Sequence, residues 1–396
     1  MATPLSQKIA SHIREIGHPI TFANFMEMAL YDSEYGYYTT GSSPGQSGRP
    51  GFPIGMAGGD FYTAPCVSPL LAQILVRQLQ EIDGRLGHPS DFTLLEMGPG
   101  EGRLIKDILD EIKKVDSDLY ARLSIILIER SPFLQTVQKQ AVEGHSHINK
   151  KVTWVSHLNN LKDESLVGVF LSNELVDAFP VHRVRMEPEG LKEIYVDLVD
   201  GQFVEYLDEP STDDLLKVLK ACESTLPVGM TTEINVNAVE WMQEVVRVLH
   251  AGVVLTIDYG HTSQDYFSPQ RNEGTLMCYY RHTVTTNPYE RIGEQDMTAH
   301  VNFSNLAQVG EKTGLTLTGF TNLIHFLMSL GIDEIISGYD QESPEVKGAI
   351  ELLRPQGMGT TFKVLIQHKG VEISTLQALR HRPFFDGVLI PVGCGT

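Results

Sequence analysis

The 396-residue sequence has few cysteines, no long apolar run and too few basic residues to balance its acids. Its four cysteines are scattered without C-x-x-C spacing, which indicates reduced thiols in a cytosol-like compartment and no zinc site. No run of 18 apolar residues occurs, so no membrane-spanning helix is predicted. The 31 Lys and Arg against 50 Asp and Glu give a net charge of -19, which disfavours nucleic acid as a partner and favours a basic protein or substrate group.

The first residues also lack the apolar core of a secretory signal. Lys8 and Arg14 are accompanied by Glu15, so this segment is interpreted as a folded helix rather than a transit peptide. Together with the reduced thiols, this predicts a cytoplasmic protein of bacterial type.

The most informative stretch is FTLLEMGPGEGR, residues 92–103. An apolar strand is followed by Glu96, by Gly98, Gly100 and Gly102 at alternate positions, and by a helical pattern. This order is half of a βαβ unit, and the glycines allow a ligand to lie against bare backbone beside a helix N-terminus. The alternative is an ordinary turn with a solvated glutamate.

A second acid, Glu129, ends the apolar stretch 124–129. A carboxylate at the end of the next strand can accept hydrogen bonds from two ribose hydroxyls. The spacing E-x-G-x-G-x-G differs from the G-x-G-x-x-G of dinucleotide-binding folds, which disfavours an NAD-dependent oxidoreductase.

The alternation of strands and helices predicts an α/β fold with a doubly wound parallel sheet. We expect residues 1–88 to form an N-terminal helical region. It contains a Gly/Pro-rich loop at 41–59, which is either a lid or simply a connection. Residues 89–396 are expected to form a Rossmann-like core with insertions at about 181–235, antiparallel in pattern, and 320–355, helical in pattern.

Acids gather after the apolar strand 167–172, where Asn173, Glu174 and Asp177 follow one another. Ligands of open α/β sheets bind at the carboxyl ends of strands. Two carboxylates there can hold the donor fork of a guanidinium and leave its attacking nitrogen nucleophilic. The alternative is a helix N-terminus, with Asn173 as the cap and the acids in the first turn.

Other candidate residues have both a functional and a structural interpretation. Asp60 either binds the amino group of a cofactor or lies in a turn, and Asp258 either faces the substrate or binds backbone N–H groups at a strand end. Asp296 and His300 share a face if their segment is helical, and a metal is discarded because no third ligand is found.

These pieces together resemble the MidA-like S-adenosylmethionine (SAM) methyltransferases, which are related to the mitochondrial protein arginine methyltransferase that assists assembly of respiratory complex I. The glycine turn with Glu96 is similar to motif I of the class I SAM methyltransferases. The other matching blocks span nearly the whole chain in family order: YDSEYGYY (31–38), GDFYTAP (59–65), LLEMGPGEGRL (94–104), SNELVDAFPVHR (172–183), TIDYG (256–260), GTLMCYYRH (274–282), DMTAHVNF (296–303) and MGTTFKVL (358–365).

The resemblance implies SAM as cofactor and a protein arginine as substrate, in a complex I core subunit or its bacterial counterpart. Carried over, the glycine turn and Glu129 become SAM ligands, and Asp60, Asn173 and Glu174 lie at the pocket. Apart from the resemblance, we assign Asp258, Asp296 and His300 to the substrate side. Cys66 and Met277 depart from the family pattern, where a glutamate and an arginine are common. The competing hypothesis is a non-catalytic assembly chaperone that grips a basic partner; the oligomeric state is left open.

Overall fold

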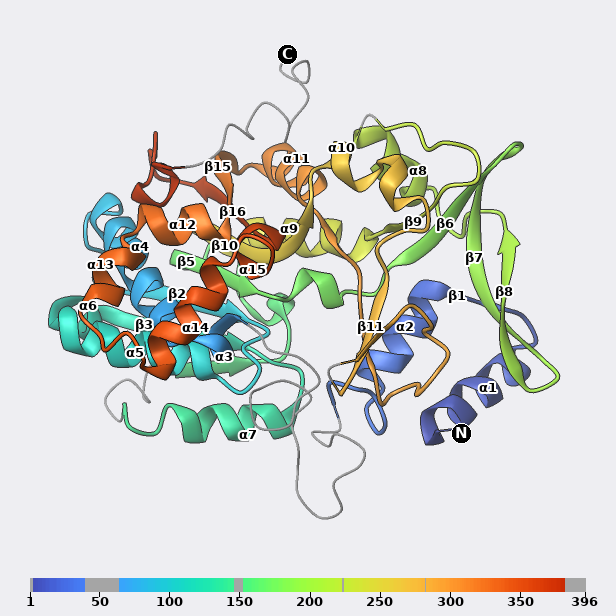
Figure 1. The fold of residues 1–396 in the computed structure, drawn as a ribbon, viewed down its shortest axis with the longest axis horizontal. Helices are drawn as coiled ribbons and strands as arrows, with labels where there is room; N and C mark the ends of the chain where they lie inside the picture. The colour runs from blue at the N-terminus through green and yellow to red at the C-terminus, as the bar shows by residue number, and fades with distance from the viewer. Residues whose placement is uncertain (1–2, 40–63, 146–151, 223, 282, 382–396) are drawn as a thin grey trace. The chain divides into compact units, whose positions relative to one another are not determined.

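The computed structural model describes residues 3–39, 64–145, 152–222, 224–281 and 283–381 (Figure 1). Two compact units share the chain. The antiparallel unit comprises Met1–Tyr62, Val176–Glu240 and His261–Asn305, and the parallel-sheet unit comprises Thr63–Leu175, Trp241–Gly260 and Leu306–Thr396. The expected boundary at residue 88 differs from this division, because helix α4 (Leu70–Arg85) packs into the core of the parallel-sheet unit.

The parallel-sheet unit is built on one sheet with the strand order β15-β16-β10-β5-β2-β3-β4. Neighbours from β10 to β4 are parallel, whereas β16 is antiparallel to both β10 and β15. This is the doubly wound sheet that the sequence predicts. The strands are β2 (Phe92–Met97), β3 (Leu123–Ile128), β4 (Val152–Val155), β5 (Leu166–Asn173), β10 (Leu249–His261), β15 (Thr316–Asn322) and β16 (Phe362–Lys369).

Helices with an apolar stripe complete the core of this unit. In α5 (Arg103–Val115), the stripe consists of Leu104, Ile105, Ile108, Leu109 and Ile112, all at most 3% exposed. The remaining helices are α3 (Ala64–Val67), α4 (Leu70–Arg85), α6 (Ser117–Arg122), α7 (Pro132–Ala141), α9 (Val236–Val248), α11 (Phe303–Thr313), α12 (Leu323–Ser329), α13 (Ile332–Ser337), α14 (Pro344–Leu353) and α15 (Met358–Thr361), of which α9 and α11 cross from one unit to the other.

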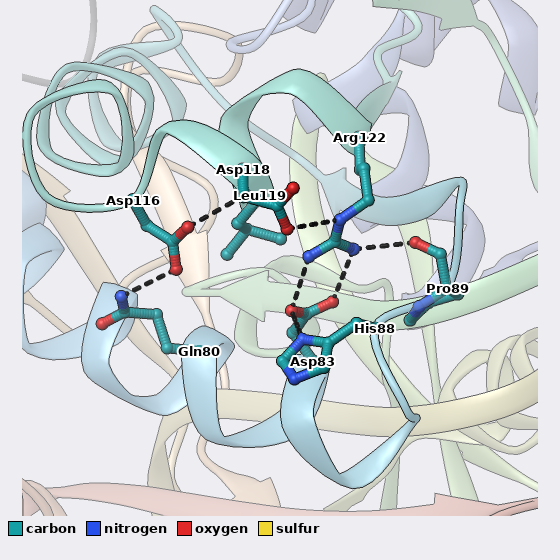
Figure 2. Close-up of polar contacts among 8 residues, drawn as sticks. All are labelled: Gln80, Asp83, His88, Pro89, Asp116, Asp118, Leu119 and Arg122. Atoms are coloured by element: carbon teal, nitrogen blue, oxygen red, sulfur yellow. Dashed lines mark hydrogen bonds and ion pairs between the residues drawn. The ribbon is translucent and has the colours of Figure 1, made fainter.

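A buried ion pair joins the end of α4 to α6 (Figure 2). Asp83 accepts two hydrogen bonds from the Arg122 guanidinium, at 2.9 and 2.8 Å, and one contact from His88 Nδ1 at 2.6 Å. Arg122 also donates to the Pro89 carbonyl at 2.7 Å and to Asp118 at 2.9 Å. Burial alone would raise the pKa of Asp83, but the hydrogen bonds from Arg122 and His88 outweigh it and leave this pKa below its ordinary value.

The antiparallel unit begins with the predicted helical hairpin. Thr3 caps α1 (Pro4–Ile16) by accepting from the Ser6 N–H, and Gly17 ends it. A two-residue strand, β1 (Ile20–Thr21), leads into α2 (Phe22–Tyr31) and pairs with β7. The hairpin therefore shares a core with the antiparallel sheet.

Two antiparallel sheets and several short helices complete this unit. One sheet has the order β1-β7-β6-β9 with β8 beside β7, and the other has the order β12-β11-β13. The predicted antiparallel insertion is thereby confirmed. The elements are β6 (His182–Glu187), β7 (Gly190–Val199), β8 (Gln202–Asp208), α8 (Asp214–Ala221), β9 (Thr231–Ile234), α10 (Ser263–Tyr266), β11 (Met277–Tyr280), β12 (Thr283–Thr285), β13 (Asp296–Thr298) and β14 (Val301–Asn302).

The structure differs from the sequence prediction for residues 320–355, and it does not describe the loop 41–59. The helices predicted within 320–355 belong to the main core of the parallel-sheet unit rather than to a separate insertion, because α12 and α14 contribute Phe326 and Leu352 to it. The loop 41–59 lies outside the described residues. Within the ranges that the structure describes, no helix is both long and apolar enough to span a bilayer.

Candidate cofactor and catalytic site

The ends of four neighbouring strands bring the predicted acids of the parallel-sheet unit to one edge. Met97 lies opposite both Ile128 and Ser172, and Ile257 lies opposite Asn173. Residues that follow these positions therefore lie in one row at the carboxyl edge of the sheet. The row contains the glycine turn after β2, Glu129 after β3, Asn173 and Glu174 at the end of β5, and Asp258 near the end of β10.

The glycine turn has the bare backbone that the sequence indicates. Gly98, Gly100 and Gly102 have φ of 71°, 53° and 78°, a region that residues with a side chain rarely adopt. A Cβ on Gly98 would lie 2.8 Å from Leu175 Cδ1, whereas a Cβ on Gly100 would meet no atom within 4 Å. The backbone at Gly100 therefore borders open space, which a ligand can fill.

Glu96 is buried next to this turn, at 3% exposure. Its Oε2 atom has no hydrogen-bond partner among the described residues, and burial raises the pKa of Glu96 to about 8. The amide oxygen Oδ1 of Asn173, also buried, lacks a partner in the same part of the chain. The register places Glu96 and Asn173 on the same face of the sheet, because Glu96 lies opposite Leu171 and side chains alternate along a strand.

Unsatisfied buried polar atoms are uncommon and cost about 1–3 kcal/mol each. Two of them on adjacent strand ends, beside open backbone, indicate that a polar ligand belongs here.

Glu129 is tied to the glycine turn through a glutamine that sequence reasoning missed. Its Oε1 accepts from the Ser131 N–H at 2.7 Å and its Oε2 from Gln138 Nε2 at 3.2 Å. The same Nε2 donates to the Gly100 carbonyl at 2.7 Å, and Trp154 Nε1 donates to Gln138 Oε1 at 3.1 Å. Burial raises the pKa of Glu129, and the Ser131 and Gln138 hydrogen bonds act against it. A buried glutamine in α7 has no distinguishing sequence signal, so only the fold reveals this link.

Glu174 is held in a strained conformation at the end of β5. Its φ is 50°, in the left-handed region that favours glycine. The Glu174 N–H donates to the Ile257 carbonyl at 2.9 Å, and Oε1 accepts from the Ala64 N–H at 2.9 Å and from Asn173 Nδ2 at 3.2 Å. No α-helix begins at Asn173, which is the last residue of β5, so Asn173 is not a helix cap, although Asp177 lies in the short 3-10 helix Val176–Ala178. Non-glycine strain of this kind concentrates at functional sites.

Asp258 has the contacts of a strand-end carboxylate that binds backbone. It is fully buried and accepts from the Leu175 N–H at 3.2 Å and the Tyr259 N–H at 2.8 Å. These contacts match its structural interpretation, and its substrate role stays a prediction. They also fix the chain directly after Glu174.

The other predicted acids belong to the antiparallel unit. Asp177 is 5% exposed, and its carbonyl accepts from the Ala299 N–H. Asp296, fully buried, accepts from the Tyr38 hydroxyl at 2.8 Å. Tyr38 is the last residue of the block YDSEYGYY (31–38), but the sequence pattern does not indicate its role.

His300 does not share a helix with Asp296, because Asp296 starts strand β13 and His300 lies in the connection between β13 and β14. The conditional helical interpretation is therefore wrong. His300 Nδ1 instead lies 2.9 Å from His261 Nε2. No group of three metal-ligating side chains occurs among the described residues. The predicted cofactor ligand Asp60 lies outside the described residues.

Comparison with known proteins identifies the family. The model of the Methyltransf_28 family, described as S-adenosyl-L-methionine-dependent methyltransferases, matches residues 70–321. The chain belongs to this family. A solved COG1565 superfamily protein from Burkholderia thailandensis, bound to S-adenosyl-homocysteine, is similar over 96% of this chain and 95% of its own, with 29% identity and a TM-score of 0.84.

Curated relatives are similar over almost the whole length. The human mitochondrial protein arginine methyltransferase NDUFAF7 is 26% identical over 96% of this chain and 88% of its own. The Drosophila melanogaster homologue is 26% identical over 93% and 85%. The prediction of a cytoplasmic protein is wrong, because these relatives are mitochondrial proteins.

The methyltransferase uses SAM, which supplies an electrophilic methyl group on a sulfonium when it is bound. The residues present fit such a cofactor. The orphaned Oε2 of Glu96 suits a cationic ligand, and the open backbone at Gly100 leaves room for one.

Proposed function

We propose that this methyltransferase transfers the methyl group of SAM to an arginine of a protein substrate. The observation that carries the proposal is Glu174, a strained carboxylate fixed at the carboxyl end of β5 beside the glycine turn. The relatives named protein arginine methyltransferases support the choice of acceptor.

For the cofactor, we assign the backbone of Gly98, Gly100 and Gly102 to the amino-acid part of SAM and Glu129 to its ribose. Glu129 suits this role because Gln138 and Ser131 already orient both of its oxygens. Glu96 is assigned to the cationic part of the cofactor, since its buried Oε2 needs a donor. Asp60, outside the described residues, keeps its sequence-based assignment as a SAM ligand.

For the acceptor, Glu174 binds and orients the guanidinium. Its carboxylate, which the Ala64 N–H and Asn173 Nδ2 orient through Oε1, is assigned to two guanidinium N–H groups, because a carboxylate and a guanidinium pair in a bidentate geometry. The charge pair draws positive charge toward the bound nitrogens and leaves the third nitrogen nucleophilic. Its attack on the methyl carbon would break the S–CH3 bond of the sulfonium, release S-adenosylhomocysteine and give up one N–H proton. Asn173 holds Glu174 in place, and catalysis then depends mainly on positioning.

Asp177, Asp258, Asp296 and His300 keep their sequence-based assignment as further acceptor-side residues. Asp177 follows Glu174 by three residues, and the Tyr38 hydroxyl orients the Asp296 carboxylate. From the sequence resemblance, we propose that the protein acted on is a core subunit of respiratory complex I or its counterpart.

The test combines SAM binding with a methyl-transfer assay. Glu174→Gln is expected to keep SAM affinity within about tenfold, or ~1.4 kcal/mol. Turnover is expected to fall by about 10²–10³, because the guanidinium loses its fixed counter-charge. The readouts are calorimetry with SAM and transfer of labelled methyl to a protein extract, followed by acid hydrolysis to identify the methylated amino acid.

Asp177→Asn is measured alongside, because its contribution is assigned from chain position alone. Labelled methyl-lysine in place of methyl-arginine, or full turnover in Glu174→Gln, would refute the proposed acceptor site. Saturable SAM binding with no labelled protein in any extract would favour the assembly chaperone.

A further inference from the structure

The antiparallel unit has one long strand whose outer edge is exposed. β8 pairs with β7 alone among the described strands, with Gln202 opposite Val199 and Asp208 opposite Glu193 (Figure 1). No other backbone hydrogen bond to residues 202–208 occurs in the described part of the chain. An edge of this kind presents a row of N–H and C=O groups to which another chain can pair.

Edge strands are usually short or covered, and the others described here follow that rule. β4 and β9 have four residues each, and β15 is buried except for its first two residues. β8 has seven residues, of which four are exposed. Its exposed Tyr206 and the neighbouring Val199 are 49% and 52% accessible.

The inner face of β8 is fixed, so the edge is preorganised. Phe203 packs against Phe25 and Tyr289 with ring centroids 5.9 and 6.2 Å apart. Two residues after Phe203 in β8, Glu205 accepts a hydrogen bond from the Tyr289 hydroxyl at 3.2 Å and forms an ion pair with Arg183. The alternate residues, which include Tyr206 and Asp208, lie on the other face because side chains alternate along a strand.

The surrounding segment is strongly acidic. Residues 187–214, which contain the β7–β8 hairpin, have ten Asp or Glu and one Lys. This net charge of -9 in 28 residues compares with -19 for all 396. Pairing β8 with β8 of a second copy would bring like charges together, which opposes self-association.

We infer that the β8 edge binds an extended basic segment of a partner protein by strand addition. Backbone pairing supplies the affinity, and Lys or Arg side chains of the added strand lie beside Asp200, Asp208 and Glu209. An arginine on the outer face can also lie over the Tyr206 ring. The inference deepens the proposed function, since it makes the hairpin a docking surface for a basic methyl-acceptor protein.

The probe is a fluorescent 12-residue peptide of alternating Arg and Val, titrated with the full chain in 50 mM salt. A second peptide of the same sequence, N-methylated at alternate residues, keeps the charge but cannot pair along one edge. We expect saturable binding of the first peptide and at least about tenfold weaker binding of the second, because lost backbone pairing removes the main contribution.

The matched protein variants separate this surface from overall charge. Asp200→Asn/Asp208→Asn/Glu209→Gln removes three hairpin charges, whereas Glu15→Gln/Asp333→Asn/Glu372→Gln removes three exposed charges elsewhere. The hairpin variant is expected to bind the peptide about tenfold more weakly and the control within about twofold of wild type, since exposed charges act within about 14 Å at this ionic strength.

Equal binding of both peptides, equal loss in both variants, or no saturable binding would overturn the inference. None of these outcomes depends on methyl transfer. A protein that binds the peptide but labels no arginine would therefore refute the proposed function and leave the docking surface in place.

Discussion

Two buried carboxylates in the parallel-sheet unit differ in how they are satisfied. Asp83, 2% exposed, has both oxygens bound by the Arg122 fork (Figure 2), and its pKa is lowered. Glu96, 3% exposed, has an Oε2 atom with no partner in the described ranges, and its pKa is raised to about 8. The protein itself supplies the partners of the first carboxylate, whereas the described residues supply none for Oε2 of the second.

The difference shows that burial of an acid does not identify a functional site. What separates the two is whether the protein supplies the counter-charge. The same criterion explains why Asp258, buried with two backbone N–H donors, has the contacts of a structural residue. The variants that follow change either the surroundings of Asp83 or the surroundings of Glu96.

The largest effect is expected from Arg122→Ala. It leaves the buried Asp83 without its guanidinium, and breaking such a pair costs about 3–5 kcal/mol of unfolding free energy. Asp118→Asn is the control, because the Asp118 side chain is 78% exposed and should contribute at most about 1 kcal/mol. Urea unfolding followed by circular dichroism measures both; a loss below 1 kcal/mol for Arg122→Ala would remove the structural side of the comparison.

Next in size is Gly100→Ala, which adds a methyl group where no protein atom lies within 4 Å. At a positive φ this change costs roughly 1 kcal/mol of stability. SAM affinity is expected to fall about tenfold or more, or ~1.4 kcal/mol, because the methyl group occupies the space of the cofactor. Gly17→Ala at the end of α1 is the matched control, with φ of 71° and equally open surroundings. Gly17→Ala should lose as much stability as Gly100→Ala but keep the SAM affinity of wild type. Equal SAM affinity in the two variants would show that the cofactor does not bind beside Gly100.

The effect of pH on SAM affinity depends on Glu96. In the free protein Glu96 is protonated below its pKa of about 8, and the cationic cofactor favours the ionised form. SAM binding therefore releases a proton below pH 8, and affinity should rise between pH 6 and 8 by up to about tenfold per unit, then level off. Calorimetry in buffers of different ionisation enthalpy measures the proton. Glu96→Gln should remove the pH dependence, and an unchanged profile in this variant would assign it to another group.

The smallest effect is expected at acid pH. Because the pKa of Asp83 is lowered in the folded state, its ionised form adds stability above the unfolded pKa of about 4. That contribution disappears as the pH falls through the lower folded value. The difference in unfolding free energy between wild type and Asp83→Asn should thus be constant from pH 5 to 7 and shrink below pH 4. A difference that persists at pH 3 would contradict this account.

Local signals predicted the elements that surround the site. The glycine spacing predicted the turn after β2 and the helix that follows, and the apolar runs predicted β3, β5 and β10. Thr3 and Gly17 marked the ends of α1 through side-chain and backbone contacts a few residues away. These interactions are short in sequence, so propensity and spacing are enough to indicate them.

Partners far apart in sequence could not be predicted in this way. Gln138 links Glu129 to the turn, and Ala64 meets Glu174 over 110 residues, only because the strands and helices pack in this order. The left-handed backbone of Glu174 is imposed by its neighbours, since an isolated glutamate avoids that region.

By itself, the sequence determined the doubly wound sheet, the bare glycine turn and the family, because each rests on local patterns along the chain. Only the tertiary structure decided which buried acids are satisfied, since the partner that reaches a carboxylate depends on register and packing. It also decided that β8 lies at an open edge, because strand order is set by long-range pairing that no local pattern encodes.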